Sequence, residues 1–328
     1  MHADETASTG SEMPGGPATR GRTVTIVWLA LIAATVVGWL VSGHDGAGAD
    51  PVRIATILGL AAVKIYLVIA LFMGDCGMAL VSPPVDLARI ARIRQSQLIA
   101  LNSLFPFIAV FFLGWAVLGH LIPPPSPSLG GEEMARFLLG SRDRLIACMM
   151  LSMMSIAFLM PFSAAIIGQI ARIEAEGPRV WTYAALMAAA GNVVSFTFPL
   201  MFLGVALFRP DRSPDLVLLA SDLGFLPFLG MACPYIAFPI CVAIAGLLDT
   251  SSEPAFPRWY CWFSIASTIA ILPAPMLMFF HDGWFAWNNL FGWWLPFSDV
   301  FGWMMVTWWL VRRAINAQAA TATAEAAA

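Results

Sequence analysis

Eight long apolar segments occupy most of the chain and limit its fold more than any other feature. They lie at approximately residues 23–43, 53–74, 97–121, 145–170, 181–208, 224–248, 259–280 and 286–311. Each is close to the roughly 20 residues that an α-helix needs to cross a bilayer. A membrane barrel would need strands of alternating polarity, which the segments lack. The sequence therefore predicts an all-α integral membrane protein with eight transmembrane helices.

The composition supports the same fold class and excludes one class of partner. Hydrophobic residues make up 59% of the chain and charged residues only 11%, whereas a soluble domain is about one quarter charged. Such an apolar surface needs the lipid bilayer as its solvent. The net charge of -3, without any basic block, indicates that nucleic acid is not a partner.

Proline separates the first two predicted helices from the other six. The segments at 23–43 and 53–74 contain no proline, and every later segment contains at least one (Pro106, Pro161, Pro199, Pro227, Pro234, Pro239, Pro273, Pro275, Pro296). Proline lacks the backbone N–H and leaves a carbonyl oxygen that lipid cannot satisfy. We therefore predict two straight N-terminal helices and a six-helix bundle of proline-kinked helices.

These patterns predict five regions along the chain. Residues 1–22 are expected to be a disordered cytoplasmic tail, and residues 23–80 a two-helix segment. A cytoplasmic loop at 81–96 would lead into a six-helix membrane domain at 97–313. Residues 314–328, rich in alanine and threonine, are expected to be a disordered tail.

Arginine residues predict the orientation in the membrane, since they concentrate on the cytoplasmic side. If the N-terminus lies in the cytoplasm, the inner segments carry ten (Arg20, Arg22, Arg89, Arg92, Arg94, Arg172, Arg179, Arg258, Arg312, Arg313). The outer segments then carry six (Arg53, Arg136, Arg142, Arg144, Arg209, Arg212). The prediction is a multi-pass protein of the bacterial plasma membrane with both termini in the cytoplasm.

The first two helices carry a family resemblance. The first contains "VWLALIAATVVGWLVSG" and the second "AAVKIYLVIALFM", with a Lys–x–x–Leu–Val pattern followed by Phe–Met. Residues 23–75 resemble the prokaryotic cytochrome c oxidase subunit IV family. The resemblance implies a non-catalytic accessory or assembly subunit of a haem-copper respiratory oxidase. Residues 97–313 look like a bacterial multi-pass membrane family from which no function carries over.

Two opposite charges lie deep within predicted helices. Lys64 is near the middle of the second segment and Asp299 near the middle of the last. A lysine at the bilayer centre costs roughly 2.5–3.5 kcal/mol on insertion scales. We predict that Lys64 and Asp299 form an intramembrane charged pair. The alternative is that Lys64 extends its ammonium group to the interface while Asp299 separately faces a wet cavity.

Polar residues in the kinked helices suggest a second function class. They are Asn102, Ser163, Gln169, Asn192, Ser195, Thr197, Ser264, Ser267, Thr268 and Asn288. They could line a path through the six-helix domain, as in a small-molecule or proton-coupled transporter. Alternatively, they hydrogen-bond neighbouring helices, which is the commoner role of such residues.

The potential metal ligands are few and badly placed for a cofactor. The four histidines (His2, His44, His120, His281) lie outside the helix interiors, and the five cysteines form no C-x-x-C pair. His120 and His281 end helices near Glu132, Glu133 and Asp282, without a metal-binding spacing. No clustered catalytic set or phosphate-binding loop occurs. We predict no metal, no cofactor and no enzymatic activity.

Overall fold

The computed structural model describes residues 87–327. The chain divides into one unit at Met1–Pro83 and a second at Pro84–Ala328, and only the second is described below. The two-helix segment predicted at 23–80, including Lys64, thus lies outside the described residues. Within the described residues every regular element is a helix, in agreement with the predicted all-α class.

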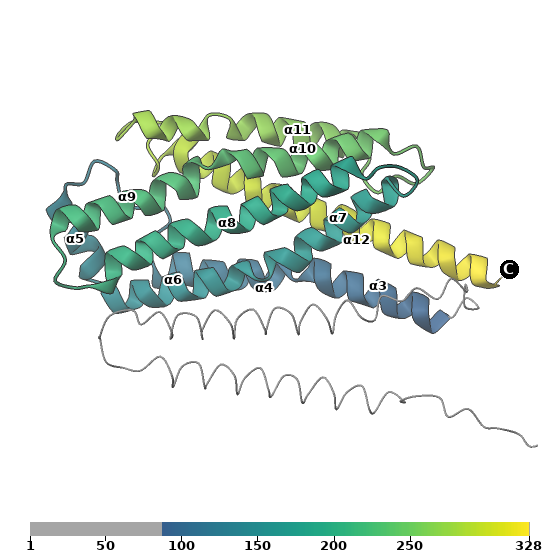
Figure 1. Ribbon diagram of the computed structural model, residues 1–328, viewed down its shortest axis with the longest axis horizontal. Helices are drawn as coiled ribbons and strands as arrows, with labels where there is room; N and C mark the ends of the chain where they lie inside the picture. The colour runs from purple at the N-terminus through teal and green to yellow at the C-terminus, as the bar shows by residue number, and fades with distance from the viewer. Residues whose placement is uncertain (1–86, 328) are drawn as a thin grey trace, which may run out of the picture. The chain divides into compact units, whose positions relative to one another are not determined.

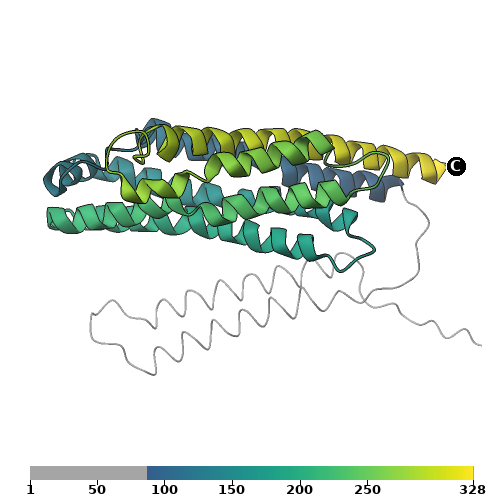
Figure 2. The ribbon, with the colours of Figure 1, turned by 90° about the horizontal axis from the view of Figure 1, so that it is seen from above.

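The helices run lengthwise beside one another (Figures 1 and 2). In chain order they are α3 (Leu87–Asn102), α4 (Leu104–Phe112), η1 (Leu113–Leu118), α5 (Gly131–Leu139), α6 (Arg142–Ile156), α7 (Leu159–Ile173), α8 (Val180–Phe208), α9 (Pro214–Gly230), α10 (Ala232–Leu248), α11 (Arg258–Ile271), η2 (Ala274–Phe279), η3 (Leu290–Trp294) and α12 (Leu295–Ala327). The short α5 lies at one end of the bundle and the C-terminal end of α12 at the other (Figure 1).

Five helical stretches are long and apolar enough to cross a membrane. They are Leu87–Leu118, Arg142–Ile173, Val180–Phe208, Pro214–Leu248 and Arg258–Phe279. Each overlaps one of the predicted segments of the six-helix domain, and together they indicate a membrane protein. The sixth predicted segment forms η3 and α12, which are helical but are not among these apolar stretches. Five of the predicted eight spans are thus supported by the described residues.

Two predicted irregular regions are helical instead. The predicted loop at 81–96 is wrong from Leu87 onward, where α3 begins, and the predicted disordered tail is wrong up to Ala327, where α12 ends. Tertiary contact explains both, because α3 and α12 pack together. Arg94 Nε donates to Asn316 Oδ1 at 2.9 Å. Alanine, the best helix former, is frequent in the α12 tail.

Five of the six long stretches are broken rather than merely kinked. In each, a proline stands in the first turn of the piece that follows the break: Pro106 in α4, Pro161 in α7, Pro234 in α10, Pro275 in η2 and Pro296 in α12. The N–H groups of a first turn have no partner within the helix, so proline is tolerated there. Only α8 continues unbroken, with Pro199 in its interior.

One serine links two of these breaks. Ser103 separates α3 from α4, and its hydroxyl lies 2.7 Å from the Ala100 carbonyl oxygen. The same hydroxyl lies 2.7 Å from the carbonyl oxygen of Phe158, which separates α6 from α7. The single proton of the hydroxyl is therefore shared between two carbonyl oxygens. Broken helices in an apolar environment need such internal donors.

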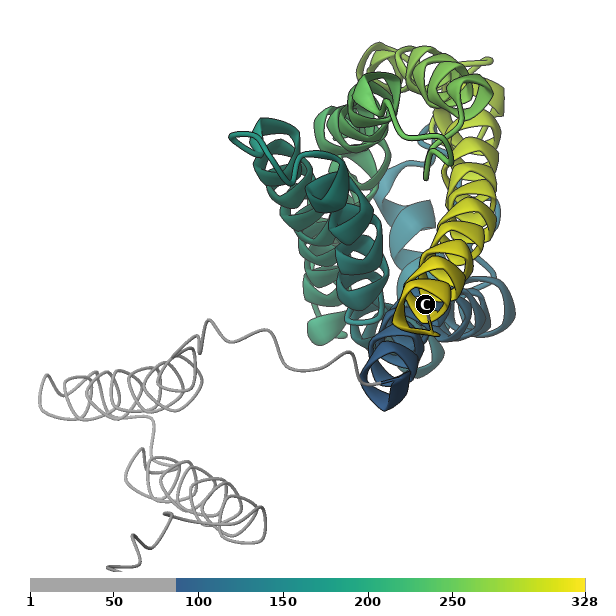
Figure 3. The same cartoon turned by 90° about the vertical axis from the view of Figure 1, so that its right-hand side faces the viewer.

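Six helices form a ring within this unit. In the order α8, α10, α11, α12, α3 and α7, each packs against the next, and α7 packs against α8. The end-on view shows these helices around a common interior (Figure 3). Phe162 of α7 and, from α4, Phe107 and Phe111 are fully buried within this unit. Side chains that point inward from the six ring helices share the common interior.

Candidate functional site

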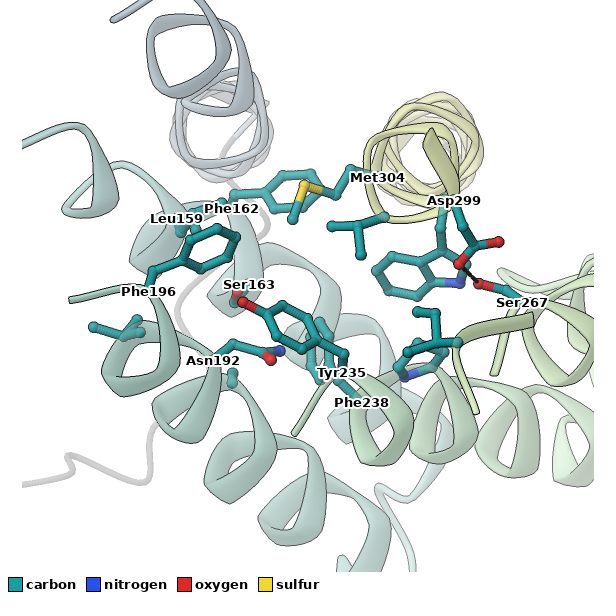
Figure 4. Close-up of a pocket in the computed structure, with 16 residues that line it drawn as sticks. Leu159, Phe162, Ser163, Asn192, Phe196, Tyr235, Phe238, Ser267, Asp299 and Met304 are labelled. Atoms are coloured by element: carbon teal, nitrogen blue, oxygen red, sulfur yellow. Dashed lines mark hydrogen bonds between the residues drawn. The ribbon is translucent and has the colours of Figure 1, made fainter. Parts of the chain in front are cut away.

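A cavity of about 40 Å³ lies between five helices of the ring. Its lining comes from α7, α8, α10, α11 and α12: Leu159, Phe162, Ser163, Ala189, Asn192, Val193, Phe196, Tyr235, Phe238, Pro239, Ser267, Ile271, Asp299, Val300, Trp303 and Met304. We call this cavity the polar pocket (Figure 4). Asn192 lies near the middle of α8, so the pocket is far from both ends of that span.

Asp299 supplies the carboxylate of the polar pocket. It lies in the second turn of α12, is half-buried and accepts a hydrogen bond from Ser267 Oγ at 2.6 Å. Within residues 87–327 it forms no ion pair with any arginine. A partly buried carboxylate without a counter-charge is disfavoured, and the Ser267 hydroxyl offsets part of that cost. A cation that enters the pocket would be attracted to Asp299.

Asn192, Ser163 and Tyr235 lie on the other side of the pocket from Asp299 and Ser267 (Figure 4). The Oδ1 atom of Asn192 is buried and has no hydrogen-bond partner among the described residues. Pro239, four residues after Tyr235, lacks the N–H that would bond the Tyr235 carbonyl oxygen within α10. This side of the pocket thus offers Asn192 Oδ1 as an acceptor that the described residues leave unused.

Hydrogen bonds between α11 and α12 hold the pocket side chains in place. Trp303 Nε1 donates to Ser264 Oγ at 3.0 Å, and the hydroxyl groups of Tyr260 and Thr307 are hydrogen-bonded. With the bond between Ser267 and Asp299, they make three successive links along the two helices. The residues that form these links are three or four positions apart on α11 and four apart on α12, so they lie along one face of each helix. The orientation of α11 against α12 therefore determines the position of Asp299.

A second cavity, of about 50 Å³, adjoins the polar pocket. Phe196, Tyr235, Ile271 and Val300 line both cavities. The rest of the second lining is apolar: Phe111, Phe228, Leu229, Ala232, Pro296, Phe297 and Phe301. We call it the apolar pocket. A ligand with a polar head and a short apolar tail would match the two cavities together.

Two π-helices place a stacked tryptophan pair behind the apolar pocket. Trp115 of η1 and Trp293 of η3 have ring centroids 5.7 Å apart and planes 15° apart. Both are fully buried, and neither indole N–H has a partner among the described residues. Trp115 also stacks on Phe228, which lines the pocket. Short π-helical segments are rare and often occur near functional sites.

Nine of the polar residues singled out in the sequence fall into three groups: pocket-lining residues, acceptors of hydrogen bonds from other helices, and donors within their own helix. Ser163, Asn192 and Ser267 line the polar pocket. Asn102, Gln169 and Ser264 accept hydrogen bonds from other helices, while Ser195, Thr197 and Thr268 donate to carbonyl oxygens of their own helices.

The pairing of Lys64 with Asp299 stays a prediction, because Lys64 lies outside the described residues. In residues 87–327 no group of three His, Cys, Asp or Glu side chains is arranged to hold a metal ion. Tyr235 was not singled out in the sequence. The sequence pattern that could have identified Tyr235 is its position four residues before Pro239 in an apolar span.

The chain was compared with known protein families, curated proteins and solved structures, and none of them matches it.

Proposed function

We propose that residues 87–327 form a membrane transport unit that binds a small solute in the polar pocket and couples its movement to the charge state of Asp299. The single observation that carries this proposal is the position of Asp299. It lies at a cavity wall between helices, with Ser267 as its hydrogen-bond partner and no ion pair within the described part of the chain. Ionisable groups inside membrane spans commonly mark the path of an ion or a substrate.

The broken helices support the same function. Secondary transporters commonly bind their substrates near the bilayer midplane, at helices that are interrupted there. Here α7 and α10, which line the polar pocket, each begin after a break in a long span. Free backbone groups at a break are tolerated in the membrane where protein or a cavity surrounds them. The same breaks provide points at which the two halves of a span can move relative to each other.

Transport requires that the pocket open to each side of the membrane in turn, and this can be tested without knowing the solute. We suggest Ser163→Cys, a nearly isosteric change at the pocket lining. A charged, membrane-impermeant thiol reagent should label it in right-side-out and in inverted vesicles, beyond the labelling of the parent chain. Met187→Cys is the control, because Met187 is on the same helix as Asn192 and 76% exposed on the bundle surface. A lipid-facing thiol should stay unlabelled.

Labelling of Ser163→Cys from neither side, or from one side only, would contradict transport. Site-resolved mass spectrometry separates the introduced cysteine from the five native ones, of which Cys148, Cys233, Cys241 and Cys261 are free thiols in the described part of the chain.

The resemblance of residues 23–75 favours a second function, an accessory or assembly subunit of a haem-copper respiratory oxidase. On this proposal the chain is not an enzyme, and its partner is the oxidase complex in the bacterial plasma membrane. A tagged full-length chain, purified from its native membranes in mild detergent, should then carry oxidase subunits and their haem absorption. Purification without them from membranes that contain the oxidase would contradict this function.

A further inference from the structure

We propose that the polar pocket binds a small monovalent organic cation, such as a guanidinium or alkylammonium ion, with the cationic group at Asp299. This inference rests on the proposed function, because it assigns the class of solute to the same cavity. Four features of the cavity lead to it: its charge, its unused hydrogen-bonding groups, its aromatic wall and its division into two parts.

The charge of the site favours a cation. Within the described residues Asp299 has the Ser267 hydroxyl as its hydrogen-bond partner, and no arginine faces it as an ion pair. In a low-dielectric interior a carboxylate attracts a cation far more strongly than in water. It would repel an anion by the same amount, and a neutral ligand would leave its charge uncompensated.

The remaining polar groups favour a ligand rich in N–H donors. Asn192 Oδ1 is a buried acceptor without a partner, and Pro239 leaves the Tyr235 carbonyl oxygen without its helical donor. The indole N–H of Trp303 is already used by Ser264. Guanidinium and ammonium groups carry donors and no acceptors, so they complement the Asp299 carboxylate and the unused Asn192 Oδ1.

The wall of the pocket is largely aromatic. Five ring-bearing residues from four helices line it: Phe162, Phe196, Tyr235, Phe238 and Trp303. The face of an aromatic ring carries negative charge density and attracts organic cations within about 6 Å of its centroid. A guanidinium group can also stack flat on such rings.

The size of the two cavities limits the ligand. A cavity of about 40 Å³ accommodates roughly three groups the size of a water molecule. That space suits a guanidinium or methylammonium head rather than a large quaternary ion. The adjoining apolar pocket, of about 50 Å³, has the chemistry of an alkyl chain. The best ligand is therefore a cation with a short apolar tail.

Guanidinium and urea provide a matched pair of probes, because the two are nearly identical in shape and differ in charge. We suggest measuring the binding of guanidinium, urea and methanesulfonate at millimolar concentrations to the full chain in detergent, by calorimetry and thermal shift. Guanidinium should bind and raise the melting temperature above that of urea-treated protein. Asp299→Asn, which removes the charge at nearly constant shape, should weaken guanidinium binding by about tenfold or more.

Asp222→Asn is the matched control for Asp299→Asn. Asp222 is an acidic residue in a long apolar span, and it lines a separate cavity with His281 and Trp287. Guanidinium affinity should be unchanged in this variant. A single cooperative thermal transition of unliganded Asp299→Asn shows that it is folded. Equal guanidinium affinity in Asp299→Asn and the parent chain would overturn the proposal.

The tail is tested with propylguanidinium, which should bind more tightly than guanidinium. Ala232 is buried and lines the apolar pocket, so Ala232→Val should remove this gain and leave the affinity for guanidinium itself intact. Retention of the full gain in Ala232→Val would place the tail elsewhere and overturn the two-part site.

Different measurements test the ligand class and the transport function. The ligand class is wrong if urea or methanesulfonate binds as well as guanidinium, or if guanidinium does not bind. In either case the transport function stands as long as Ser163→Cys is labelled from both membrane faces. If Ser163→Cys is not labelled from both faces, the proposed transport function fails independently of any probe.

Discussion

Ser267 of α11 donates its hydroxyl proton to Asp299 of α12 at 2.6 Å. This bond joins the carboxyl group of Asp299, in the second turn of α12, to the neighbouring helix. It is also the last of the three links that connect the two helices. A change in the charge of Asp299 therefore acts directly on the contact between α11 and α12.

Ser267→Ala should destabilise the protein, because it removes the donor that Asp299 has within the described residues. The expected loss is about 1–2 kcal/mol of unfolding free energy, a charge-assisted bond being stronger than a neutral one. Thr268→Val is the control, since the Thr268 hydroxyl donates only to the Ser264 carbonyl oxygen of its own helix. Thermal unfolding in detergent should show the larger loss for Ser267→Ala, and equal losses would show that the bond to Asp299 contributes nothing.

Gly292→Ala should prevent normal packing of η3. An added Cβ would lie 2.8 Å from the Ala286 carbonyl carbon and 2.9 Å from Trp287 Cα, and it would clash with the Ala286 carbonyl oxygen. These are backbone atoms that cannot move aside cheaply. We expect a loss of about 1–3 kcal/mol or more, measured as a lower melting temperature.

Gly302→Ala is the matched control for Gly292→Ala. Gly302 lies in the interior of α12, and no atom lies within 4 Å of the added Cβ. Alanine should therefore be neutral or stabilise by up to about 1 kcal/mol through its helix propensity. Equal melting temperatures for the two variants would contradict the close approach at Gly292.

Glu174 should make the stability of α8 dependent on pH. It follows the end of α7 and accepts hydrogen bonds from the backbone N–H groups of Trp181 and Thr182, at 3.0 and 2.8 Å, and from Thr182 Oγ1 at 2.8 Å. Burial acts to raise the pKa of Glu174, but these bonds and the charge of Arg179 together lower it below its ordinary value.

Because the pKa of Glu174 is lower in the folded state, its stabilisation is present above the ordinary glutamate pKa of about 4.3. It is lost as the pH falls through the folded value. Glu174→Gln should therefore cost about 1 kcal/mol at neutral pH and nothing at strongly acid pH. Glu176→Gln, at an exposed position of the same loop, should cost little at any pH. A pH-independent loss in Glu174→Gln would refute the role of its charge.

The predicted pair of Lys64 and Asp299 is tested by a double-mutant cycle. Removing one partner of a buried pair typically costs about 3–5 kcal/mol, because the other charge is stranded. Lys64→Met and Asp299→Leu should each lower the melting temperature, and the double variant should recover most of the loss. In that case Lys64 would neutralise Asp299 when no solute cation is bound. Additive losses would mean that the two residues act separately.

The orientation is tested with reporter fusions. A reporter after residue 130 should give an external signal, and one after residue 176 a cytoplasmic signal. The excess of arginine in the predicted inner segments is the physical reason. The reverse pattern would refute the orientation with both termini in the cytoplasm.

The sequence by itself determined the fold class and the position of the long helices. Apolar runs of about 20 residues can satisfy their backbone in lipid only as helices, and most of each predicted segment from residue 97 onward is helical. The prolines also predicted irregular helices correctly. The exact breaks at Ser103 and Phe158 depend on a hydroxyl that two spans share, which hydropathy does not encode.

Only the tertiary structure decided which polar residues face one another. In the sequence Ser264 and Ser267 are equivalent polar positions of one span, but Ser264 accepts from Trp303 and Ser267 donates to Asp299. The role of each depends on the rotation of α11 against α12, which local residues do not specify. Likewise, α3 and the end of α12 are polar enough to suggest irregular chain. They are helical in the structure, because α3 and α12 pack against each other and Arg94 of α3 is hydrogen-bonded to Asn316 of α12.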